Sequence, residues 1–514
     1  MALMAIREAW ANRWTLVDRI WTRLGPSSLP SPDNWQVWVT LAVLIRSFFF
    51  LFKVYTAPDS TVHYPGIFAS EASDTVSYFG PIDSLLQAGS YSDDHRMPGY
   101  GWVYMLLRLA LPVRTSLNSV AILQLLLSSI SVYVLAKLAA RVFQSVPYFY
   151  AVFLAFALST YTALWDHVLL AESFCTSALV FSHYWLLTAN SEKRHYLLSG
   201  LMLTWCVFLR PVTVPLLALF GLYILLRPGL GSLAGVARWR LFAAFLAPFL
   251  MLDGAWTLRN YRVHGGFYPL MTTIGYKGEK ESHYGALIRF VQAFGGSTVW
   301  WAPRAEMTFF IPLPTSARSS DTTVRFRDDI YTSKFDQSSL VEVRNMLGVL
   351  RDDSVALDRK RPLEAEVIRR LDSYTISIRD EKPFLYHVVS RLRVAKTFLL
   401  HSGTYNLFTR PSSELRTWEL AIKVFYSLLY CFVVLFGLLG AVWLALRGDL
   451  ESRLVSFTTL FLTFVHPILF KMDEFRYLSP AYPFLILSAA LFLSGVWDLV
   501  TIREARASGP ETVR

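Results

Sequence analysis

Apolar residues run along this chain in long blocks instead of the narrow stripes that mark a soluble amphipathic helix. A helix needs about 20 apolar residues in a row to cross a bilayer. The blocks therefore predict an all-α polytopic membrane protein with about ten transmembrane helices. We expect these helices near residues 36–55, 117–138, 147–164, 168–187, 196–210, 212–227, 240–257, 419–446, 454–471 and 478–498.

Basic residues between the blocks predict the orientation of the helices, because Lys and Arg are retained on cytoplasmic loops. The apolar segment 99–113 would reverse every later helix if it crossed the bilayer. We therefore expect it to be an interfacial or half-inserted helix. Ten helices with both chain ends inside then place these residues in the cytoplasm: Lys137, Arg141, Lys193, Arg194, Arg227, Arg238, Arg240, Arg447 and Arg453.

This topology predicts two regions outside the membrane, on its non-cytoplasmic side. In the second of them, residues 362–401 mix charged and apolar positions at helical spacing, which predicts amphipathic helices at the membrane surface. The expected parts are a cytoplasmic segment (1–35), a transmembrane module (36–257) with an external loop (57–98), an external region (258–418), the C-terminal transmembrane helices (419–498) and a cytoplasmic tail (499–514).

Composition agrees with a membrane protein. Of the 514 residues 54% are hydrophobic and 17% are charged, too few charges for the surface of a soluble protein of this length. Basic cytoplasmic loops account for the net charge of +11, so we expect no nucleic-acid partner. Cys175, Cys206 and Cys431 lie inside apolar blocks and indicate small buried side chains, not a disulfide framework or a zinc site.

Polar residues that interrupt the apolar pattern collect on the external side, and ionisable groups at membrane depth are costly and often functional. Asp74 and Tyr78 are four residues apart, so they share a face if their segment is helical. His95 and Arg96 come shortly before the apolar segment that begins at Gly99. An ordinary solvated loop is the alternative interpretation.

A second external turn carries Asp166, His167 and Glu172. These three could supply metal ligands or a reactive carboxylate, or they could simply form a polar cap on the turn. Glu172 lies deeper in an apolar run, so the polar-cap explanation fits it less well.

Arginines at the external ends of helices break the usual distribution of positive charge. Arg210, Arg259 and Arg476 are of this kind, and Asn260 follows Arg259. A guanidinium presents a planar fork of donors that suits phosphate. Pairing with a carboxylate of the same chain would also explain each arginine.

Five segments in order resemble the GT-C glycosyltransferases, most closely the branch of protein O-mannosyltransferases and aminoarabinose transferases. They are Asp74 with the Arg96–Tyr100 motif, LLAESF (169–174), FLRPV (208–212), WTLRNYRVHG (256–265) and FRYLSPAYP (475–483). The resemblance covers about residues 40–300 and returns at 463–495. Two departures, Thr75 after Asp74 and Gly101 after Tyr100, leave the branch and the sugar open.

The resemblance implies a GT-C-like helical bundle that moves a sugar from a polyprenyl or dolichyl phosphate to an acceptor hydroxyl, with inversion. The acceptor is a glycan, a lipid or a protein. The chemistry needs a base for the hydroxyl and positive charge on the departing phosphate. We expect Asp74 as base, Glu172 as a second catalytic carboxylate, and Arg96, Arg259 and Arg476 as phosphate ligands. The remaining substrate-binding candidates are Tyr78, His95, Tyr100, Asp166, His167, Arg210 and Asn260.

The active site would face the non-cytoplasmic side of a bacterial inner or plasma membrane, which is favoured over the endoplasmic reticulum. No cofactor is expected with certainty, and a divalent cation is left open. Two other classes also explain charges inside the membrane: a transporter or flippase for lipid-linked sugars, and a non-catalytic membrane assembly subunit. The absence of inverted repeats and the large external region disfavour a transporter.

Overall fold

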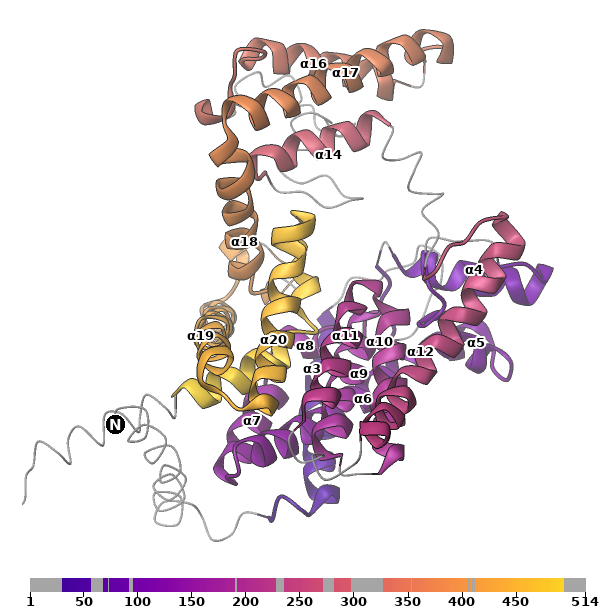
Figure 1. The fold of residues 1–514 in the computed structure, drawn as a ribbon. Helices are drawn as coiled ribbons and strands as arrows, with labels where there is room; N and C mark the ends of the chain where they lie inside the picture. The colour runs from indigo at the N-terminus through magenta and orange to yellow at the C-terminus, as the bar shows by residue number, and fades with distance from the viewer. Residues whose placement is uncertain are drawn as a thin grey trace, which may run out of the picture. The chain divides into compact units, whose positions relative to one another are not determined.

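A computed structural model shows a helical protein (Figure 1). It describes residues 30–56, 68–72, 74–91, 96–189, 192–227, 235–270, 282–296, 327–352, 354–404, 407–408, 410 and 412–493. Within these ranges no β-strand forms, and extended pairing is confined to isolated bridges such as Ser70 with Val168. The chain divides into two compact units. The first comprises Met1–Thr272, Ser402–Leu462 and Ser479–Arg514, and the second Thr273–His401 and Thr463–Leu478.

The first unit is built mainly from apolar helices. In chain order they are α3 (Trp35–Thr56), α4 (Thr75–Ala88), α5 (Gly101–Arg108), α6 (Val113–Val142), α7 (Pro147–Ala157), α8 (Thr160–Ala163), α9 (Glu172–Thr188), α10 (Lys193–Leu209), α11 (Pro215–Leu226), α12 (Gly235–His264), α19 (Thr417–Arg447), α20 (Leu450–Phe464) and a helix at Tyr482–Leu493.

Five helices in the described part of the chain are long and apolar enough to cross a membrane. They are Trp35–Thr56, Val113–Val142, Ala237–His264, Thr417–Arg447 and Leu450–Phe470. Within the described residues, the other five predicted membrane segments also contain helices, and the parts of these helices that the structure describes are shorter than the roughly 20 residues that a perpendicular crossing needs. An all-α membrane protein with several crossings is therefore supported, and the total of ten stays a prediction.

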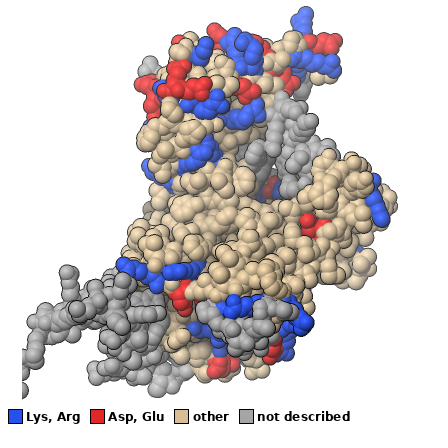
Figure 2. All heavy atoms as spheres, viewed as in Figure 1, with Lys and Arg blue, Asp and Glu red and all other residues tan. Residues whose placement is uncertain are grey.

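Exposed apolar side chains on these helices support contact with lipid. On α3, Leu44, Phe48 and Leu51 are all exposed, and on α19 Leu428 and Leu435 are exposed as well. Figure 2 shows a broad surface of the first unit with few charged side chains. A contiguous apolar surface of this kind would be unusual on a soluble monomer, so it fits a hydrocarbon environment.

Close helix packing depends on small residues. Helix α10 packs against both α9 and α12. At Gly200 of α10, an added Cβ would lie 1.9 Å from the backbone oxygen of Phe245 on α12. Only glycine lets these two backbones approach so closely, as is common between membrane helices.

The apolar segment at 99–113 contains a single short helix, α5, of eight residues. At 1.5 Å per residue it is roughly 12 Å long, too short to cross a bilayer. Its start is anchored to α10, because the Trp205 indole donates to the Gly99 oxygen at 3.1 Å. A Cβ at Gly99 would lie 2.5 Å from the backbone carbon of Phe208, so glycine is required at this contact.

The second unit has its own small core. Its helices include α14 (His283–Phe294), α16 (Gln337–Arg351), α17 (Leu357–Glu381) and α18 (Ser390–Leu400). Val367, Leu371 and Tyr374 form an apolar stripe on α17 and are buried in this core, in which α17 packs against α14 and α16. Charged side chains crowd part of the surface of this unit (Figure 2).

The amphipathic pattern at 362–401 predicts helices at the membrane surface. The helices do form there as α17 and α18, and their contact with a membrane stays a prediction. The apolar stripe of α17, however, faces protein. A stripe at helical spacing reports that one face is buried, and it does not distinguish a lipid surface from a neighbouring helix.

Candidate functional site

Asp74 and Arg96 form an ion pair in the first external loop of the predicted topology. Asp74 lies directly before α4, and an Arg96 Nη2 to Asp74 Oδ1 distance of 3.2 Å joins the two side chains. The guanidinium also donates to the Ser77 hydroxyl at 3.0 Å and stacks on the Tyr78 ring at 4.7 Å. Asp74 and Tyr78 therefore contact the same arginine.

Tyr100 extends the site inward from this ion pair. Its ring meets Tyr78 edge to face, with 5.1 Å between the centroids, and it is fully buried. Its hydroxyl donates to the Gln124 side chain at 2.6 Å. Burial, with Tyr78 and Glu172 nearby, raises the pKa of Tyr100 well above its ordinary value, so the phenol stays a hydrogen-bond donor.

Gln124 of α6 connects the first external loop to the second turn. Its amide donates to the backbone oxygens of Asp166 at 3.0 Å and Val168 at 2.8 Å. A second link is the backbone bridge between Ser70 and Val168. A third is the Thr75 hydroxyl, which donates to the Leu169 oxygen at 3.0 Å. The structure thus brings together the two acidic segments that the sequence singled out separately.

Asp166 is buried and faces Arg46 of α3. The Nη1 to Oδ2 distance is 3.6 Å, and the Ser173 hydroxyl donates to the other carboxylate oxygen at 2.7 Å. Burial raises the pKa of Asp166 to about 6, although Arg46 and Ser173 favour its ionised form. Asp166 thus has a structural partner on α3, and its predicted contact with substrate stays a prediction.

Glu172 and Arg210 form a second ion pair, between the first residue of α9 and the residue that follows α10. Arg210 donates to Glu172, whose side chain is 1% exposed. This pairing is the carboxylate alternative considered for Arg210 from the sequence. Tyr100 contacts both segments, since its ring meets Tyr78 and also packs against Phe174 with centroids 5.7 Å apart.

Arg259 near the end of α12 joins the site through Tyr91. Its guanidinium donates to the backbone oxygen of Tyr91 at 3.1 Å and lies over the Tyr91 and Trp256 rings. The Tyr91 hydroxyl in turn donates to the backbone oxygen of Arg96 at 3.4 Å. The Asn260 side chain accepts a hydrogen bond from Arg259 and donates one to the backbone oxygen of Tyr268. Asn260 thus fixes the backbone near the end of α12.

Two predicted histidines have different outcomes. His167 is buried beside Phe50, with ring centroids 6.3 Å apart, and burial lowers its pKa to about 3, so it is neutral at physiological pH. His95 lies outside the described residues, together with Asp93 and Asp94.

The last predicted arginine belongs to the second unit. Arg476 lies in a short 3₁₀ turn, with its Nε 3.7 Å from Glu474 and its guanidinium over the Tyr477 ring. In the same unit the Lys471 ammonium lies over the Tyr386 ring at 4.1 Å. A phosphate-binding role for Arg476 stays a prediction.

The described residues offer no ligand set for the divalent cation that the sequence left open. Nowhere among them do three His, Cys, Asp or Glu side chains gather as metal ligands. Asp74, Asp166 and Glu172 each face an arginine instead. Cys175 and Cys206 are buried free thiols with sulfurs 3.3 Å apart.

Sequence reasoning missed two residues that organise this site, Arg46 and Gln124. Arg46 is a lone arginine in the middle of an apolar block, a signal that could have marked it because such residues are rare in membrane helices. Gln124 carries no charge, and nothing in the sequence indicates that it binds the 165–168 turn.

Comparison with known proteins adds no relative to this picture: no protein-family model matches the sequence, and no curated protein matches it.

Proposed function

We propose that this protein is a membrane glycosyltransferase that moves a sugar from a lipid-phosphate carrier to an acceptor hydroxyl. The observation that supports it best is the Asp74–Arg96 pair, in which a buried carboxylate and a guanidinium lie 3.2 Å apart in an aromatic setting. A carboxylate can take a proton from a hydroxyl, and a guanidinium fork suits a departing phosphate. The two groups together meet the needs of this reaction.

In the proposed reaction the acceptor oxygen attacks the anomeric carbon of the sugar. The bond from that carbon to the phosphate oxygen breaks, and its electron pair leaves with the lipid phosphate. The proton of the acceptor hydroxyl passes to Asp74. Arg96 stabilises the charge that develops on the phosphate, because fixed donors in a dry site act strongly. Direct displacement inverts the anomeric carbon.

The ion pair also suggests the order of events. Arg96 contacts Asp74, Ser77 and Tyr78. A lipid phosphate that binds Arg96 would compete with the Asp74 carboxylate for its N–H groups. The carboxylate would then be released toward the acceptor only once the donor is present. Arg259, held next to Tyr91, would add positive charge at the same edge of the site.

The Glu172–Arg210 pair has a positioning role in this proposal. The pair links α9 to α10, and Tyr100 packs against Phe174, two residues after Glu172. Glu172 remains the alternative base if Asp74 is dispensable. An ion pair can also fix a loop in a protein without an activity, so the transfer assay, and not the Asp74–Arg96 pair alone, separates an enzyme from a non-catalytic subunit.

A transfer assay with the purified full-length protein tests the proposal. Polyprenyl phosphates that carry different radiolabelled sugars are offered with a panel of hydroxyl acceptors, and free lipid phosphate is measured. We expect time-dependent release of lipid phosphate together with a labelled acceptor. Movement of intact lipid-linked sugar across liposomes, without release of lipid phosphate, would instead identify a flippase, and neither activity would favour an assembly subunit.

A further inference from the structure

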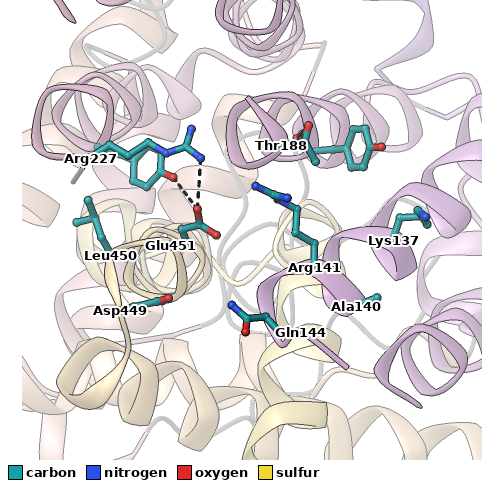
Figure 3. Close-up of a pocket in the computed structure, with 11 residues that line it drawn as sticks. Lys137, Ala140, Arg141, Gln144, Thr188, Arg227, Asp449, Leu450 and Glu451 are labelled. Carbon is teal, nitrogen blue, oxygen red and sulfur yellow. Dashed lines mark hydrogen bonds and ion pairs between the residues drawn. The ribbon is translucent and has the colours of Figure 1, made fainter. Parts of the chain in front are cut away.

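The first unit contains a cavity of about 850 Å³ among the ends of several helices (Figure 3). Its size is that of a small-molecule site. It lies far from the Asp74–Arg96 pair. Helix α9 has Glu172 at its first residue and Thr188, which lines the cavity, at its last. That length of helix spans roughly 24 Å.

Positive side chains reach this cavity from two helices. Lys137 and Arg141 are four residues apart on α6 and share a face. Arg227 follows the end of α11. Figure 3 shows the Arg141 guanidinium reaching into the middle of the cavity. All three residues fall on the side that the charge distribution predicts to be cytoplasmic.

The carboxylates that line the cavity are engaged by the protein. Asp449 accepts from the Ser452 backbone N–H at 2.8 Å and so caps the start of α20. Glu451 lies 3.5 Å from Arg227 and accepts from the Tyr223 hydroxyl at 3.4 Å. Lys137 pairs with Asp33 at 2.6 Å, but the Asp33 side chain is 85% exposed. An ion pair with so exposed a carboxylate is weak, so a phosphate that binds Lys137 can replace Asp33.

We infer that this cavity binds the phosphate of an anionic ligand through Lys137 and Arg141. An anionic phospholipid headgroup and a soluble phosphate compound share this chemistry. The lipid source is favoured, because basic pockets between membrane helices on the cytoplasmic side bind anionic headgroups. Tyr184 and Tyr223 in the lining are also residues typical of the membrane interface. The inference does not depend on glycosyl transfer.

Thermal unfolding of the detergent-purified full chain tests this inference. Short-chain phosphatidylglycerol, short-chain phosphatidylcholine and inorganic phosphate are each titrated against the parent, Lys137→Gln and Arg141→Gln. The control is Arg114→Gln, which removes the same charge from an exposed position at the opposite end of α6. It separates a local site from a general effect of net charge.

We expect phosphatidylglycerol to raise the melting temperature of the parent and of Arg114→Gln. Lys137→Gln and Arg141→Gln should each need about ten times more lipid for half of that effect, the usual loss for one charge-assisted hydrogen bond. Protection by inorganic phosphate with the same dependence on Lys137 and Arg141 would also support the phosphate site and identify a soluble ligand.

Two results would overturn the inference. One is equal protection of the parent by phosphatidylcholine, which has no net charge. The other is an unchanged response of Lys137→Gln, which we expect to fold because the partner of Lys137 is an exposed carboxylate. The Lys137 variant therefore decides the question even if Arg141→Gln, which also loses a hydrogen bond to the Leu187 oxygen, is unstable.

Discussion

The Arg96 guanidinium lies 3.2 Å from the Asp74 carboxylate, so one ion pair contains both the proposed base and the proposed phosphate ligand. Any substitution at one of them also changes the other. The variants must therefore be assayed both for transfer and for binding of the lipid phosphate product.

Asp74→Asn keeps the size of the side chain but removes the proton acceptor. We expect transfer to fall by roughly a hundredfold or more, the usual scale for loss of a general base. Binding of the lipid phosphate should persist, because the variant keeps Arg96 and removes one carboxylate beside it. The rate of transfer at saturating donor is the measurement. Near-normal transfer would move the role of base to Glu172.

Arg96→Ala and Arg259→Ala should both weaken binding of the lipid phosphate product. We expect at least a tenfold loss for each, with Lys at either position intermediate, because lysine keeps the charge and loses the planar fork. Titration of the purified variants with lipid phosphate measures the effect. Arg262→Ala is the matched control, since Arg262 is an exposed arginine on the same helix as Arg259. Parent-like binding by both alanine variants would make these arginines structural.

Substitutions in the Glu172–Arg210 pair test its contribution to stability and its contribution to activity separately. Glu172→Gln removes the carboxylate beside the largely buried Arg210 guanidinium, which should destabilise the fold by about 3–5 kcal/mol. The double variant Glu172→Gln with Arg210→Met should recover much of that loss. Unfolding in detergent and the transfer assay are measured together. A stable but inactive double variant would show that the pair also positions a substrate, whereas an active one would limit it to packing.

Acid should destabilise the protein through His167. Burial lowers its pKa to about 3 from an ordinary value of 6.5, so the unfolded chain binds the proton first. The stability that neutral His167 contributes is therefore present above pH 6.5 and is lost as the pH falls toward 3. Between pH 7.5 and pH 5 we expect a loss of about 2 kcal/mol from this residue.

Comparison of the parent with His167→Gln checks this dependence, with melting temperatures taken at both pH values. The raised pKa of Asp166 acts in the opposite direction, because the folded state takes up that proton more readily than the unfolded chain. Asp166 is present in both proteins, so their difference isolates His167. An equal shift in the two proteins would contradict a buried neutral histidine.

Local features of this site were predictable from the sequence, whereas long-range ones were not. The common face of Asp74 and Tyr78 follows from a spacing of four residues, and the helices follow from the apolar blocks. The partners of Asp166 and Glu172 depend on which helices pack together, which no local pattern specifies. The same limit explains α17, because the spacing of Val367 and Leu371 predicted an apolar face without saying what covers it.

Arg46 has a consequence for how the chain enters the membrane. In the finished fold it is fully buried and donates to the oxygens of Phe156 and Thr162. Thr162, however, is synthesised 116 residues later. During translation α3 thus meets the bilayer with an arginine whose partners do not yet exist, at a cost of about 2.5–3.5 kcal/mol for a lone helix. We therefore expect the insertion of α3 to become more favourable once Thr162 and Asp166 have been synthesised and can pair with Arg46.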